Sequence, residues 1–261
     1  MICDDTTIRQ HAGSERRKVL THPEGRGQAI SVRAKTLVRV LGLTIVALVI
    51  ANSVVHTIAA LTGRDTMLGL VQFFSLDAER NLPTWYSSIT LLISAFLLAI
   101  IAAAERAVGT WARHWLGLSV VFVALSADEA AVFHEMSIIP IRNLLGLDGV
   151  LFFAWVVPAA VLLLIGAILY ARWFLHLPLR TQKLAGFSAI LFISGAMGVE
   201  LAGGLLTSRG LHGSSVYFAV TTLEETLEMC GVLCWIYTLL DYARLRGHEV
   251  EIRFTDRVST R

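Results

Sequence analysis

The stretch from Leu37 to Leu61 reads LVRVLGLTIVALVIANSVVHTIAAL and contains a single charged residue, Arg39. A bilayer core about 30 Å thick is crossed by roughly 20 apolar residues in a helix, so this stretch is long enough to span a membrane. Five further windows meet the same requirement. They are Trp85 to Ala104, Leu116 to Met136, Val150 to Tyr170, Leu184 to Leu206 and Val216 to Leu240. The sequence therefore predicts an all-α polytopic membrane protein, a bundle of six transmembrane helices.

The composition favours the same class. Hydrophobic residues make up 55% of the 261 residues, charged residues make up 16%, and the mean hydropathy is +0.66. With Gly added and Tyr left out, the apolar share is about 60%, against about 45 to 50% in soluble domains. The charges also gather at the ends, because segments 1–36 and 241–261 hold 20 of the 42 charged side chains. Composition thus excludes a soluble enzyme and a nucleic-acid-binding protein, and the basic ends favour the lipid bilayer, with its anionic inner leaflet, as partner.

Lys and Arg residues predict the orientation of the chain. With the N-terminus in the cytoplasm, the inner segments hold 18 of them and the outer loops hold four, namely Arg64, Arg80, Arg142 and Arg209. Basic residues collect on the cytoplasmic side of membrane proteins. We therefore expect a multi-pass protein of the cell inner membrane with both termini in the cytoplasm. Residues 37–240 form the transmembrane domain, residues 1–36 a disordered basic arm and residues 241–261 a basic tail.

Acidic residues inside the expected spans are the main anomaly of the sequence. Each costs about 2.5 to 3.5 kcal/mol to insert at the centre of a spanning helix. Helix directions and a rise of about 1.5 Å per residue place most of them at one level, in the outer half of the bilayer. No Lys or Arg lies beside them in these spans, so rim arginines, protons or bound cations must neutralise them. The acids are Asp128, Glu129, Glu135, Glu200, Glu224, Glu225 and Glu228.

Two histidines at a similar level, His56 and His134, favour a metal centre. A shell that mixes imidazole and carboxylate suits Zn, Fe or Mn. We expect a divalent metal ion to be held by His56, Asp128, His134, Glu135, Glu200, Glu224 and Glu228. Glu129 and Glu225 then remain as general bases. Taken alone, each of these two is equally well explained as a protonated side chain bonded to a neighbour.

Small residues surround Glu200 in the stretch SGAMGVELAGG, residues 194–204. Glycine and alanine allow two helices to approach closely within a membrane. We therefore expect Glu200 to be buried between helices and not to face lipid.

Two functions are favoured by this pattern over a weaker third, a purely structural or sensory membrane protein. The first hypothesis is a metal-dependent membrane enzyme, a hydrolase or an oxidoreductase, acting on a lipid or another amphiphilic substrate. The alternative is a proton- or cation-coupled transporter that titrates the same carboxylates. Each half of the chain ends in a helix with an adjacent acid pair, as in an inverted repeat, which favours transport. The ExxH pairs of soluble di-iron bundles are missing. Metal identity, substrate and oligomeric state stay open.

Overall fold

The computed structural model describes residues 34–64, 66–108 and 111–247. Residues 1–33 of the expected arm and 248–261 of the expected tail lie outside the described residues. Helix α1 begins at Ala34 and helix α9 ends at Leu245, so each reaches into the segments assigned to the arm and tail. All regular elements of the described part are helical, which agrees with the predicted all-α class.

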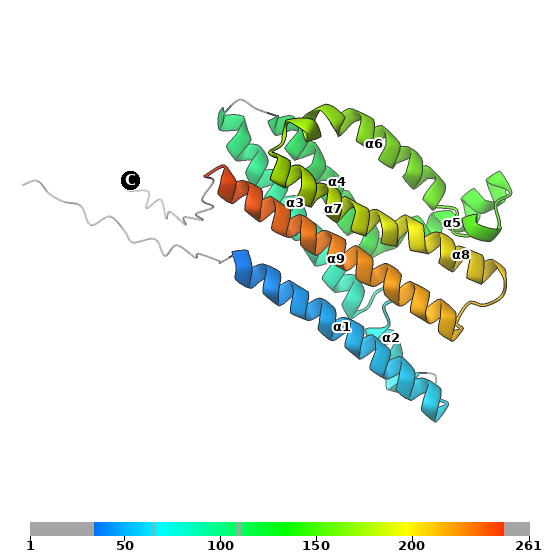
Figure 1. Cartoon of the computed structure of the whole chain (residues 1–261). Coiled ribbons are helices and arrows are strands. Elements are labelled where there is room, and N and C mark those ends of the chain that lie inside the picture. Colours follow the sequence, from blue (N-terminus) through cyan, green and yellow to red (C-terminus); the bar gives the residue numbers. More distant parts are fainter. Residues whose placement is uncertain (1–33, 65, 109–110, 248–261) are drawn as a thin grey trace, which may run out of the picture. The chain divides into compact units, whose positions relative to one another are not determined.

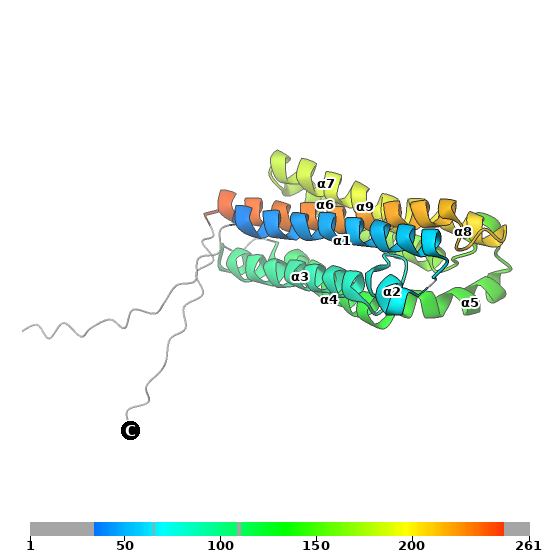
Figure 2. The ribbon, with the colours of Figure 1, turned by 90° about the horizontal axis from the view of Figure 1, so that it is seen from below.

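Long helices make up the bundle, and short elements connect them. The long helices are α1 (Ala34–Thr62), α3 (Leu82–Val108), α4 (Ala112–Ala131), α6 (Val156–His176), α7 (Leu179–Ile193) and α9 (Ser215–Leu245). The short elements are η1 (Met67–Gly69), α2 (Leu70–Phe74), α5 (Phe133–Leu145), η2 (Gly149–Leu151), the π-helical η3 (Ser194–Val199) and α8 (Glu200–Ser208). Elements α7, η3 and α8 follow one another without a gap. In Figures 1 and 2 the start of α1 and the end of α9 lie at the same end of the bundle.

Helix α9 occupies the inside of the bundle. It packs against α7, α3, α1, η3 and α8, and Ile236 and Leu239 are 0% and 1% exposed. Helix α6, in contrast, turns Leu162 and Ile168 outward with 69% and 68% exposure. An apolar outer surface around a helix that carries acids is the arrangement expected when lipid surrounds the bundle.

Four helical stretches in the described part are long and apolar enough to cross a membrane: Ala34–Thr62, Leu82–Arg106, Val156–His176 and Leu179–Ser208. The pair α4 and α5 is a fifth candidate if the bent pair counts as one span. Helix α9 has 31 residues and is therefore about 46 Å long, but its three glutamates make it less apolar than the others. The described part of the chain is thus all-helical, with four or five candidate membrane-spanning helices.

The expected third span, Leu116 to Met136, is not one straight helix. Helix α4 ends at Ala131, and α5 leaves at an angle of 81°. Val132 lies between them with a left-handed φ of 63°, and its side chain is only 5% exposed. A β-branched residue rarely adopts this conformation, so no pattern of apolar residues indicates the break. The bend moves His134 and Glu135 off the α4 axis and into the first turn of α5.

Candidate functional site

The segment between α2 and α3 brings two further carboxylates, Asp77 and Glu79, to the acidic side chains of α4 and α9. Asn52 of α1 is completely buried and anchors this segment. Its Oδ1 accepts the backbone N–H of Leu76 at 3.1 Å, and its Nδ2 donates to Oγ1 of Thr222 on α9 at 3.1 Å. The loop is therefore fixed between α1 and α9. Asn52 is therefore a structural residue of the site.

Asn81 closes the same loop from its other end. Its Nδ2 donates to the carbonyl of Ser75 at 2.6 Å and to the carbonyl of Gln72 at 3.0 Å. Its Oδ1 accepts the backbone N–H of Thr84 at 3.1 Å, which satisfies a free donor in the first turn of α3. The Thr84 hydroxyl in turn donates to Oε2 of Glu79 at 3.3 Å. Glu79 is thus held by a folded loop and does not lie on a helix.

Asp128 and His134 are paired across the break between α4 and α5. Asp128 Oδ2 lies 2.8 Å from His134 Nδ1, and Asp128 Oδ1 accepts the backbone N–H of His134 at 2.9 Å. This contact fixes the imidazole and leaves Nε2 as the nitrogen available to a ligand. A histidine that binds a metal usually donates the N–H of its other ring nitrogen to a carboxylate in this way.

Glu79, His134 and Glu135 each offer one ligand atom, and these atoms all lie within 4.8 Å of one another. Among the described residues this is the group with the spacing of a metal site. One nitrogen and two carboxylate oxygens fit Zn, Fe or Mn. Burial and the negative charge of Glu135 raise the pKa of Glu79 above its ordinary value. A cation at this point would neutralise both carboxylates.

Further carboxylates continue from this group into the bundle. Glu129 lies near Glu79, His134 and Asp128, and Glu225 lies near both Glu129 and Glu79. Beyond them, Glu200 accepts a hydrogen bond from the indole N–H of Trp155 at 2.7 Å. The Glu200 and Glu224 carboxyl groups lie beside each other. Two adjacent carboxyl groups can hydrogen-bond each other only when they share a proton.

Gly195 sets the close approach of η3 to α9 beside these acids. A Cβ atom built there would lie 2.8 Å from the carbonyl oxygen of Glu224 and 2.9 Å from Cγ of Glu228. Gly195 precedes Glu200 in a π-helical segment, a widened turn that is frequent at functional sites. Close helix approach around Glu200 is therefore present, as expected from the small residues of 194–204.

His56 and His134 have different surroundings. The His56 ring packs on Phe218 with the centroids 4.4 Å apart, and its buried Nε2 has no hydrogen-bond partner among the described residues. Asp77 is its charged neighbour, and Asp77 also faces Tyr217 and His212. The structure thus separates the two histidines that the sequence assigned to one shell.

In the described part of the chain, no Lys or Arg side chain forms an ion pair with these carboxylates. The Lys and Arg ion pairs of this part involve Asp241 and Glu105, at the other end of the helices. Arg142, near the end of α5, instead lies over the Phe152 ring at 4.1 Å. The negative charge of these acids is therefore offset by hydrogen bonds, by His134 and by bound protons or cations.

A family model described as "Domain of unknown function (DUF8692)" matches residues 40–242 of the chain. The chain belongs to this family. No curated protein and no solved structure matches it. The region matched by the DUF8692 model contains the whole carboxylate and histidine cluster, from Asn52 and His56 on α1 to Glu228 on α9.

Within this DUF8692 domain, the residues expected to form the site fall into three groups. Asp128, Glu129, His134 and Glu135 lie together where α4 meets α5. The second group, on α8 and α9, neighbours the first and consists of Glu200, Glu224, Glu225 and Glu228. His56 stands apart with Asp77. Sequence reasoning missed Asp77 and Glu79, which lie in FFSLDAERNLP, residues 73–83, outside the apolar windows.

Proposed function

We propose that the chain is a metal-dependent membrane enzyme whose divalent ion binds to Glu79, His134 and Glu135. The observation that carries the proposal is the pair Asp128–His134, because it orients an imidazole toward two carboxylates whose oxygens are within 4.8 Å. Asp128 is then an orienting residue and not a direct ligand. Sites that use three protein ligands leave a coordination position for water or substrate, as catalytic sites do.

A divalent ion in this position would supply a Lewis acid and an activated water molecule. The residues of the chain have separate tasks around it. Glu129 lies beside the three proposed ligands and is placed to accept a proton from the reacting group. Glu225 lies beside Glu129 and can pass that proton on toward Glu228 and Glu224. The glutamates of α8 and α9 thus form a proton reservoir behind the metal.

The proposed substrate is a lipid or another amphiphile. Helix α5, which carries two of the proposed ligands, exposes the apolar side chains of Phe133 and Met136 by 59% and 68%. An acyl chain would pack on this surface while a polar headgroup reaches the ion. Both hydrolysis and oxidation remain compatible with the ligand set.

Six crossings with both termini in the cytoplasm complete the proposal, with α9 as the sixth span. Its glutamates face the inside of the bundle, so a helix of this length can cross despite its charge. The start of α1 and the end of α9 lie at one end of the bundle (Figure 1), as an even number of spans requires. Arg106, Arg113 and Arg244 lie at helix ends on that side, which fits the excess of basic residues toward the cytoplasm.

Elemental analysis of the detergent-purified full chain tests the metal. We expect close to one Zn, Fe or Mn ion per chain and loss of that ion in Glu79→Gln and in Glu135→Ala. Asp148→Asn, which removes a carboxylate from the loop after α5, is the matched control and should retain the ion. A metal-free wild-type protein that is folded and active would refute the proposal.

The alternative, a proton- or cation-coupled transporter, is favoured by one observation, the side-by-side position of the Glu200 and Glu224 carboxyl groups. A shared proton inside the bundle is what a proton relay needs. Proton uptake into liposomes that contain the full chain would support it, provided that Glu224→Gln abolishes the uptake and that metal removal does not. Uptake that requires the metal ligands would instead support the enzyme.

A further inference from the structure

A cavity of about 190 Å³ lies at the end of the bundle opposite to the carboxylate cluster. It is formed where α3 and α9 end and α4 begins, together with the last turn of α6. Six of its lining residues are used below: Glu105, Trp111, Trp115, Trp173, Tyr242 and Arg246. None of them takes part in the proposed metal centre, so this cavity can be considered independently of the proposed function.

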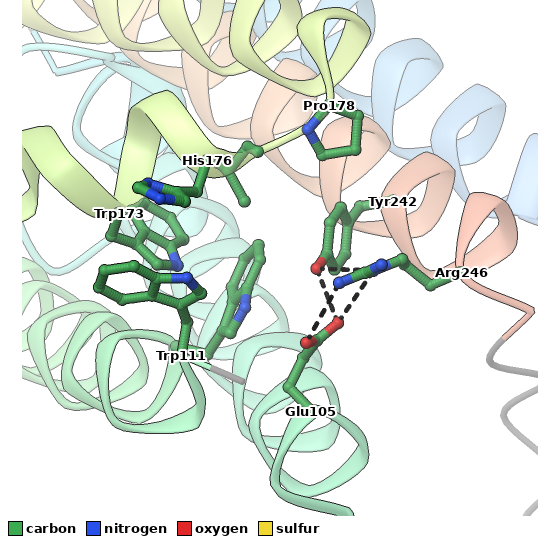
Figure 3. A pocket seen from close by; sticks show the side chains of 9 residues that line it. Glu105, Trp111, Trp173, His176, Pro178, Tyr242 and Arg246 are labelled. Carbon is green, nitrogen blue, oxygen red and sulfur yellow. Dashed lines mark hydrogen bonds and ion pairs between the residues drawn. The ribbon is translucent and has the colours of Figure 1, made fainter. Parts of the chain in front are cut away.

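Aromatic rings that brace one another form most of the wall. Trp115 is 1% exposed, and its ring centroid lies 4.8 Å from that of Trp173 in an edge-to-face contact and 4.7 Å from that of Tyr242. Figure 3 shows Trp111 and Trp173 on one side of the cavity and Glu105, Tyr242 and Arg246 on the other. Rigid aromatic walls suit either a flat ring or a cation held over the ring faces.

The hydrogen bonds of the cavity decide between these two ligands. Glu105 already accepts the hydroxyl of Tyr242 at 2.7 Å and Nε of Arg246 at 3.2 Å, so its charge is compensated. Trp173, by contrast, is 4% exposed, and its indole N–H has no acceptor within the described part of the chain. A buried donor without a partner costs about 1 to 3 kcal/mol. Among the lining residues named here, the group without a partner is therefore a donor, and an acceptor on a ligand would satisfy it.

We propose that this cavity binds a planar ring that carries carbonyl oxygens, the chemistry of a quinone. One carbonyl oxygen accepts the indole N–H of Trp173, the ring packs on the aromatic wall, and the opposite carbonyl faces the guanidinium of Arg246, whose side chain is 45% exposed. An apolar protein cavity of about 150 Å³ holds benzene, so the volume here suits one small substituted ring. An ammonium group would leave the indole N–H without an acceptor.

Equilibrium binding to the full chain in detergent tests the ligand class. The probes are tailless 2,3-dimethoxy-5-methyl-1,4-benzoquinone, its decyl-tailed analogue and p-xylene, a smaller substituted six-membered ring without carbonyl groups. We expect both quinones to bind at least tenfold more tightly than p-xylene. A stronger affinity for the tailed quinone would identify a membrane quinone, and equal affinities a soluble aromatic carbonyl compound. Equal binding of quinone and p-xylene, or tighter binding of tetramethylammonium, would overturn the proposal.

A substitution at Trp173, whose indole N–H has no acceptor among the described residues, gives the second test. Trp173→Phe keeps a flat ring and removes the N–H, so quinone affinity should fall about tenfold while p-xylene binding is unchanged. Trp85→Phe, at an indole that is 68% exposed near the start of α3, is the matched control and should bind like wild type. Unchanged quinone affinity in folded Trp173→Phe would contradict the proposal. If that variant does not fold, the comparison of quinone with p-xylene on wild type decides alone.

Discussion

His134 is bonded twice to Asp128, through its backbone N–H at 2.9 Å and through Nδ1 at 2.8 Å. The two residues belong to different helices, and the bond spans the left-handed Val132 between them. One carboxylate therefore stabilises the bend and also orients the imidazole. The direction of α5 and the position of His134 Nε2 are consequently coupled.

Asp128→Asn should separate these two tasks. Asparagine still accepts the backbone N–H of His134, so the bend persists, but it no longer presents a negative charge to Nδ1. We expect a 10- to 100-fold loss of metal affinity, the size typical of partners that orient a metal-binding histidine. Competition with a chelator measures this loss. Wild-type affinity in the folded variant would show that Asp128 only supports the bend.

Metal binding should weaken as the pH falls, because protons compete for Glu79. Burial and the charge of Glu135 raise the pKa of Glu79 above 4.5, so this competition begins at a higher pH than for an ordinary glutamate. Measurements of metal affinity at a series of pH values test this competition between protons and metal. A metal affinity that does not change with pH would contradict the assignment of Glu79 as a ligand.

The metal-free protein should show the opposite trend in stability. The folded state holds the Glu79 proton more tightly than the unfolded chain does, so its contribution is complete below pH 4.5 and is lost as the pH rises through the raised pKa. Melting temperatures in the presence of chelator should therefore decrease with pH across this range. The decrease should be smaller in Glu79→Gln, and an equal slope in both proteins would contradict the assignment.

Gly195→Ala should destabilise the bundle. Its new Cβ would meet the backbone of α9 at 2.8 Å and force η3 away from Glu224. Overpacking of this kind costs about 1 to 3 kcal/mol. Gly198→Ala is the matched control, because its Cβ would meet only Ser194 at 4.0 Å. Thermal unfolding should place Gly195→Ala below wild type and Gly198→Ala at or above it.

Asn52→Ala should loosen the loop that carries Glu79. The buried N–H of Leu76 loses its acceptor, which costs about 1 to 3 kcal/mol. Both the melting temperature and the metal affinity should fall. Ser53→Ala removes only a hydroxyl that bonds to the carbonyl of Val49 in its own helix, so it should change neither. A drop in melting temperature without loss of metal would place Glu79 outside the site.

Apolar runs in the sequence predicted the helices well because burial in lipid demands long hydrophobic segments. Overlap is clear for α1, α3, α6 and α7, and the glycines around Glu200 correctly indicated a tight helix contact. The glutamates of α9 were expected to meet acids from other helices, and the structure brings Glu224 to Glu200. Helical periodicity and depth were sufficient for these features.

The bend and the loop could not be predicted by the same means. Val132 carries no signal for a left-handed residue, so Asp128, His134 and Glu135 were placed on one helix although the chain turns between them. Asp77 and Glu79 lay outside the apolar windows and looked like ordinary surface acids. Their position depends on Asn52, a contact 24 residues away in sequence that neither composition nor periodicity reports.

The π-helical segment Ser194–Val199 has a consequence for the register of everything that follows it. If the same six residues wound as an ordinary α-helix, with none removed, the residues that follow would point in a different direction. Glu200 would then swing away from Trp155 and Glu224 while Gly195 stayed in contact with α9. The wide π-helical turn therefore lets one continuous helix present both Gly195 and the carboxyl group of Glu200 to α9.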